Sequence, residues 1–95
     1  MDHNKNKRLI RFETTNQIRI EILIDPNKTM RELIKFYFDK IKRGYLFGDK
    51  DILFIYGGNS ISHFSDDLIK DIKSGIDNDS MFILVSDAED KINLY

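Results

Sequence analysis

The sequence predicts an α+β domain in which one main helix, at about residues 29–43, packs across a sheet of four or five strands. Two β-type runs come first, a helical run follows, and two further β-type runs occupy the second half of the chain. This order allows a hairpin, a crossing helix and two later strands to bury one shared core. It restricts the fold more strongly than any single residue does.

Residues 8–14 and 18–24 place apolar side chains at every second position, as half-buried strands require. The polar stretch T-T-N-Q between them has the length of a hairpin loop, and we expect Asn16 to take a positive φ there. The second strand should bury one face and expose the other. The buried face carries Ile18, Ile20, Ile22 and Ile24, and the opposite face carries Arg19, Glu21, Leu23 and Asp25.

The helix has its own start and stop signals. Thr29 is a good N-cap, and Glu32 stands at the capping-box position. We expect Gly44 to end the helix in a left-handed conformation, and Phe36 lies off the apolar stripe. That stripe consists of Met30, Leu33, Ile34, Tyr37, Phe38 and Ile41.

The second half of the chain alternates apolar runs with turns. Residues 52–56 are almost continuously apolar, which is typical of a central strand. A glycine turn follows, and Ile61 should begin a short strand. A short helical turn is possible within 66–72, and residues 81–85 form the last predicted strand. The aromatic connector 45–51 is either a docking loop or a cap on the core, and we favour the cap.

Composition limits the class of protein. Ninety-five residues suit one domain, with 8–86 as its body, a flexible N-terminal arm at 1–7 and a charged C-terminal tail at 87–95. Fifteen basic and sixteen acidic residues are interleaved, which gives nucleic-acid binding no support. No apolar run has membrane-spanning length and there is no cysteine, so we expect an intracellular protein, cytoplasmic or nuclear, that binds no membrane.

Three segments resemble the ubiquitin-like β-grasp family. D-P-N-K-T-M at 25–30 is similar to the family's joint between strand and helix, and I-Y-G-G-N-S-I at 55–61 resembles its third strand and glycine turn. D-S-M-F-I-L-V at 79–85 resembles its last strand, and the helix leans toward the small ubiquitin-like modifier branch. The resemblance implies a mixed sheet and a domain that works by binding other proteins.

Two features depart from the family pattern. Conjugated ubiquitin-like modifiers end in Gly-Gly shortly after the last strand, whereas S-D-A-E-D occupies that stretch here. A covalent modifier is therefore disfavoured, and a permanent structural subunit of a large complex remains an alternative to an adaptor. The second departure is the connector 45–51, which is longer and more aromatic than compact members of the family would carry.

The residues favoured for partner binding are Ile55, Phe82 and Leu84. Strand alternation should point all three away from the core. Because the resemblance makes their strands neighbours, they should form one apolar patch on the open sheet face, where ubiquitin docks partner helices. Exposed apolar clusters often mark contact sites, although the C-terminal tail or Phe36 could instead cover this one.

A second candidate is the groove between the second strand and the helix, where the modifier branch accepts an added peptide strand. Glu21, Leu23 and Asp25 would line it, with Lys40 on the helix. That branch favours basic residues there, so the two carboxylates argue against acidic ligands. Any open sheet edge offers the same template.

Catalysis has little support in the sequence. His3 lies in the predicted arm, and His63 has no nucleophile in a suitable context. Asp66 and Asp67 are more typical of a helix cap than of an acid–base pair. Two histidines cannot supply a typical zinc site, so we expect a non-enzyme with no cofactor, no metal and no small-molecule substrate. Ile92, Leu94 and Tyr95 could form a linear motif or pack on the sheet, but a frayed terminus is favoured.

Overall fold

The computed structural model describes residues 7–72 and 80–92, and it confirms the α+β class. Five strands form one sheet in the order β2-β1-β5-β3-β4. β1 and β5 are parallel and the other neighbours are antiparallel, so the sheet is mixed. The elements are β1 (Arg8–Thr14), β2 (Arg19–Ile24), α1 (Met30–Lys40), a 3₁₀ turn η1 (Gly44–Leu46), β3 (Ile52–Tyr56), β4 (Asn59–Ile61), a 3₁₀ turn η2 (Ile69–Asp71) and β5 (Ser80–Asp87).

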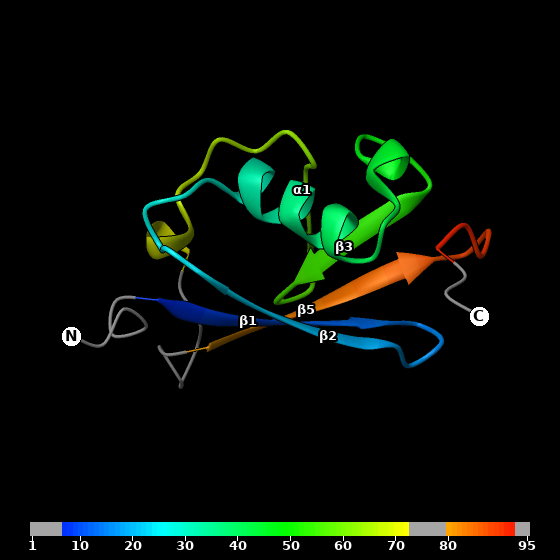
Figure 1. Ribbon diagram of the computed structural model, residues 1–95, viewed down its shortest axis with the longest axis horizontal. Coiled ribbons are helices and arrows are strands. Elements are labelled where there is room, and N and C mark those ends of the chain that lie inside the picture. Colours follow the sequence, from blue (N-terminus) through cyan, green and yellow to red (C-terminus); the bar gives the residue numbers. More distant parts are fainter. Residues whose placement is uncertain (1–6, 73–79, 93–95) are drawn as a thin grey trace.

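The helix α1 lies across one face of the sheet, and the core fills the space between them (Figure 1). All six stripe positions are buried as predicted, and Phe36 is exposed. Three rings meet at the centre, where Tyr37 contacts Phe12 at 4.5 Å and Phe54 at 5.6 Å between ring centroids. These aromatic contacts join the helix to β1 and β3.

The hairpin between β1 and β2 differs from the prediction in one residue. Gln17, not Asn16, has the positive φ, at 71°. The Gln17 amide donates to the Thr14 carbonyl at 2.9 Å, and the Ile18 amide donates to the Thr14 hydroxyl at 2.9 Å. A tight turn followed by one left-handed residue is a common hairpin connection. The Asn16 side chain is instead paired with the Thr14 hydroxyl.

The helix begins with the predicted capping box. The Glu32 amide donates to the Thr29 hydroxyl at 3.1 Å, and the Glu32 carboxylate accepts from the Thr29 amide at 3.4 Å. This backbone hydrogen bond, followed by contacts with Lys28, lowers the pKa of Glu32. Two further helix amides, those of Met30 and Arg31, donate to backbone carbonyls of the segment that precedes η2.

The helix ends three residues earlier than the sequence suggested, at Lys40 rather than about residue 43. Lys42 takes the left-handed conformation with φ of 61°, and the Arg43 amide donates to the Phe38 carbonyl at 2.8 Å. These are the marks of a Schellman motif, which usually places glycine where Lys42 stands. Gly44 does not end the helix; it begins η1.

The aromatic connector mostly caps the core, as favoured. Leu46 is buried, and the Phe47 ring lies 5.2 Å from that of Phe64 and 6.0 Å from that of His63. Tyr45 is the exception, since 77 % of its surface is exposed.

The described part of the predicted tail, residues 87–92, contacts the body of the domain. β5 continues to Asp87, and Ile92 is only 1 % exposed within the core cluster, where a frayed terminus was favoured. Residues 1–6 and 73–79, and the predicted motif positions Leu94 and Tyr95, lie outside the described residues.

Candidate functional site

The open face of the sheet brings together the three residues favoured for partner binding. Ile55 on β3 lies directly opposite Leu84 on β5, and Phe82 is two residues along β5 on the same side. The alternate residues Met81, Ile83 and Val85 are buried beneath them. We call this surface the outer face.

Phe82 is the most prominent residue of the outer face, with 52 % of its surface exposed, while Ile55 and Leu84 are half-buried. The structure adds Leu53, which is 45 % exposed on β3, opposite Ser86. Sequence reasoning missed Leu53 although the alternation that selected Ile55 also selects Leu53. Four apolar side chains on two paired strands therefore face away from the core.

Beside Phe82, β1 and β2 place charged residues on the outer face. The Arg11 guanidinium pairs with the Glu21 carboxylate at 2.9 Å, and Arg19 pairs with Glu13, across β1 and β2. Next to these pairs, Phe82 borders a hollow of about 260 Å³ that is also lined by Arg11, Arg19 and Glu21. The face thus offers an apolar patch on β3 and β5 beside charges that are already paired.

The groove between β2 and α1 contains only some of its predicted residues. A hollow of about 360 Å³ is lined by Ile22, Leu23, Phe36, Asp39 and Lys40. Leu23 and Phe36 are both about half exposed.

Of the two acidic residues expected in that groove, Glu21 pairs with Arg11, whereas Asp25 lines an adjoining hollow with Leu23 and Phe36. The Glu21 carboxylate lies 2.9 Å from the Arg11 guanidinium across β1 and β2. The Asp25 carboxylate accepts from the Asn27 amide at 2.9 Å. Lys40 does reach the edge of β2, because its ammonium donates to the Glu21 carbonyl at 2.7 Å.

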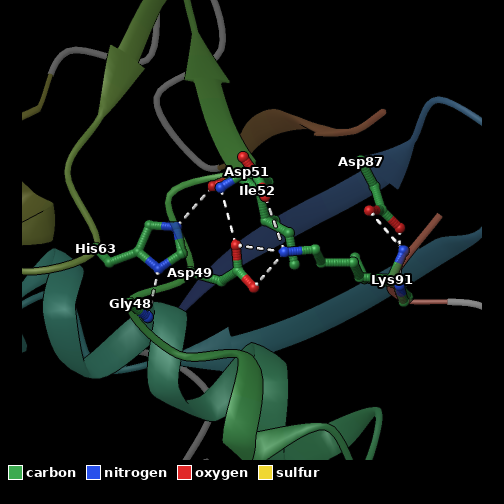
Figure 2. Close-up of polar contacts among 8 residues, drawn as sticks. Gly48, Asp49, Asp51, Ile52, His63, Asp87 and Lys91 are labelled. Atoms are coloured by element: carbon green, nitrogen blue, oxygen red, sulfur yellow. Dashed lines mark hydrogen bonds and ion pairs between the residues drawn. The ribbon is translucent and has the colours of Figure 1, made fainter. Parts of the chain in front are cut away.

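A third site, which the sequence did not indicate, lies where β3 begins and β5 ends. Figure 2 shows the Lys91 ammonium directed between the Asp49 and Asp51 carboxylates. Its shortest distance to each carboxylate is 2.9 Å. The buried Asp87 carboxylate accepts from the backbone amides of Lys91 and Ile92, both at 2.8 Å. We call Asp49, Asp51, Asp87 and Lys91 the sheet-end cluster.

Charge pairing shifts the pKa values in this cluster. The Asp51 and Asp49 carboxylates raise the pKa of Lys91 above its ordinary range. Hydrogen bonds from Lys91 and from the Asp51 amide lower the pKa of Asp49. Burial, followed by the charge of Asp87, raises the pKa of the Tyr37 phenol. Lys91 and Asp49 are therefore both charged at neutral pH.

His63 is a structural residue in this arrangement. Its Nδ1 accepts from the Gly48 amide at 2.8 Å, and its Nε2 lies 2.7 Å from the Ile52 carbonyl (Figure 2). A carbonyl can only accept, so Nε2 carries the proton in this tautomer. Both ring nitrogens are thus used to tie the connector to β3, and neither is free for proton transfer.

Within residues 7–72 and 80–92, no group of three or more histidine, aspartate or glutamate side chains is placed to hold a metal ion. In the same part of the chain, no helix combines the length and the apolar character needed to cross a bilayer.

No known family model matches the chain, and no curated protein is similar in sequence. Solved structures do match. The ubl5 domain from the polyubiquitin locus of T. thermophila has a TM-score of 0.64 and 15 % identity, covering 94 % of this chain and 99 % of that one. A ubiquitin-fold protein from Arabidopsis thaliana has a TM-score of 0.64 and 18 % identity over 90 % of each chain.

A protein described as mimicking SUMO to promote DNA repair matches about equally well, with a TM-score of 0.62 and 14 % identity, covering 87 % of this chain and 94 % of that one. These neighbours therefore do not single out the small ubiquitin-like modifier branch that the helix suggested. In this chain the matched fold is a five-stranded mixed sheet crossed by one helix. The fold of this protein is the ubiquitin-like β-grasp.

Proposed function

We propose that this domain is a non-catalytic protein-binding module that docks a partner's helix or peptide on its outer face. The observation that carries the proposal is the cluster of four apolar side chains that the fold leaves facing outward. Phe82 and Leu53 are about half exposed there, and the half-buried residues Ile55 and Leu84 lie directly opposite each other.

The energetics favour a binding role for these residues over a role in stability. Burying a large apolar side chain stabilises a complex by about 2 kcal/mol, and Phe82 contributes little of its surface to the core. Anchors of protein interfaces are commonly aromatic residues surrounded by weaker contacts. Phe82 has such surroundings in Leu84 and in the paired charges of Arg11 and Glu21.

The proposal predicts that Phe82→Asp abolishes partner capture while the domain stays folded. The protein carrying the wild-type or the variant side chain would serve as bait in a pull-down from the source cell. A matched control is Phe36→Asp, since Phe36 is 49 % exposed but lies on α1, which covers the other face of the sheet. Partners that bind wild type and Phe36→Asp but not Phe82→Asp support the outer face. Capture that survives Phe82→Asp contradicts it.

The groove between β2 and α1 is a second candidate, favoured by the exposed pair Leu23 and Phe36 beside an edge strand. The same two variants separate the candidates. Loss of capture in Phe36→Asp alone assigns binding to the groove, where an added strand would have to displace Lys40 from the Glu21 carbonyl.

A further inference from the structure

We propose that residues 88–92 form a clasp that is locked by the charge of Lys91. When locked, the clasp holds the chain after β5 over the end of the core. Without the positive charge, residues 88–92 are released as a free tail. This proposal concerns the sheet-end cluster and is independent of binding on the outer face.

The clasp is anchored at its base by Asp87. The Asp90 amide donates to the Asp87 carbonyl at 3.0 Å, and Asp90 takes a left-handed conformation with φ of 52°, which reverses the chain. The Asp87 carboxylate then accepts from the amides of Lys91 and Ile92. A charged acceptor that satisfies two backbone donors makes hydrogen bonds stronger than neutral ones.

Lys91 is the lock because it joins two segments that are about forty residues apart. Its ammonium donates to both oxygens of Asp49, at 3.1 and 2.9 Å, and to Asp51 at 2.9 Å. An isolated exposed ion pair usually contributes little. Here one cation meets two carboxylates, and the Asp51 amide holds the Asp49 side chain in place at 2.9 Å. The ion pairs are therefore held by backbone on both sides.

The clasp places the Ile92 side chain in the core. Its side chain is 1 % exposed, although it follows four residues that are exposed or half-buried. The strand register places the end of β5 beside the start of β3, because Ile52 on β3 pairs with Asp87 on β5. The clasp thus covers the end of the core where β3 starts, between the segment around Asp49 and the end of β5.

Amide hydrogen exchange of the full chain tests the lock directly. We expect Lys91→Met to accelerate exchange of the amides of residues 91 and 92 roughly tenfold, because the ion pairs to Asp49 and Asp51 that hold the clasp closed are lost. The amides that pair β1 with β2 should keep their wild-type rates, since that pairing involves neither β3 nor β5. Lys91→Arg keeps the positive charge and should exchange as wild type does.

The control is Lys50→Met, which removes an exposed lysine from between Asp49 and Asp51 and should leave exchange at residues 91 and 92 unchanged. Three outcomes would overturn the proposal. One is wild-type exchange in Lys91→Met. Another is equal acceleration in β1 and β2, which would mean global destabilisation. The third is an Lys91→Arg variant that opens as Lys91→Met does, which would show that charge is not the lock.

Discussion

The apolar part of the outer face lies on β3 and β5, and the sheet-end cluster lies where β3 begins and β5 ends, but the two are built in opposite ways. On the outer face, β3 and β5 expose Phe82 and Leu53, and the side chains make no polar contact that the fold requires. At the end of the same strand pair, Asp87 and Ile92 are buried, and each polar group has a specific partner. A single strand pair therefore carries an exposed apolar surface and ends in a partly buried polar cluster.

The difference separates residues needed for folding from residues left available for contact. Burying a carboxylate costs free energy unless hydrogen bonds replace its water, and the two amides that Asp87 accepts provide them. An exposed phenylalanine side chain contributes little to the stability of the fold, so a smaller side chain in its place costs little free energy. Substitutions at the two sites should therefore differ sharply in their effect on stability.

The largest expected effect on stability is at Ile92. Ile92→Ala removes a buried side chain and should lower the free energy of unfolding by about 3 kcal/mol. Phe82→Ala should change that free energy by no more than about 0.5 kcal/mol, as is usual for exposed positions. Urea denaturation followed by circular dichroism measures both. Equal losses in the two variants would show that the comparison is wrong.

A smaller effect of opposite sign is expected at Tyr37, beneath the sheet-end cluster. Its ring is fully buried, and its hydroxyl has no hydrogen-bond partner among the described residues. Tyr37→Phe keeps the ring contacts with Phe12 and Phe54 and removes the unpaired hydroxyl. The free energy of unfolding should rise by about 1 kcal/mol. A clear loss of stability in urea denaturation would mean that the hydroxyl is satisfied after all.

The smallest expected effect is the pH dependence of the stability that the Lys91 ion pairs contribute. The pKa of Asp49 is lowered in the folded state, so its contribution is present above its ordinary value of 3.8 and is lost as the pH falls below it. The pKa of Lys91 is raised, so its contribution is present below 10.5 and is lost as the pH rises beyond it.

Urea midpoints measured between pH 2 and 7 for wild type and Lys91→Met test the acid side of this dependence. Wild type should lose more stability below pH 4, because Asp49 has no ammonium partner in the variant. Glu32, whose pKa is also lowered, is far from the substitution and titrates equally in both proteins. Identical pH profiles would show that the ion pair contributes nothing to stability.

Local sequence signals predicted the elements whose stabilising contacts are close in the chain. The capping box needs only Thr29 and Glu32, and the helix stripe needs only a period of 3.6 residues. Strand alternation likewise predicted which way Phe82 and Leu84 point. These features formed as expected because each depends on neighbours a few residues away.

Predictions were wrong where several neighbouring residues could take the same conformation, or where a contact joined residues far apart in the sequence. Residue type favoured Asn16 and Gly44 for the turns, but hydrogen bonds to Thr14 and Phe38 placed the positive φ at Gln17 and Lys42. The cost of a left-handed residue other than glycine is about 1 kcal/mol, which such contacts can offset. Residue preference alone therefore does not decide which residue of a turn takes the positive φ, because the difference in free energy is so small.

By itself, the sequence determined the order of elements, the faces of the strands and the buried stripe of the helix. Only the tertiary structure decided that Lys91 meets Asp49 and Asp51 and that Ile92 returns to the core. The physical reason is that periodicity is a property of adjacent residues. A contact across forty residues exists only once the sheet has brought the end of β5 beside the start of β3.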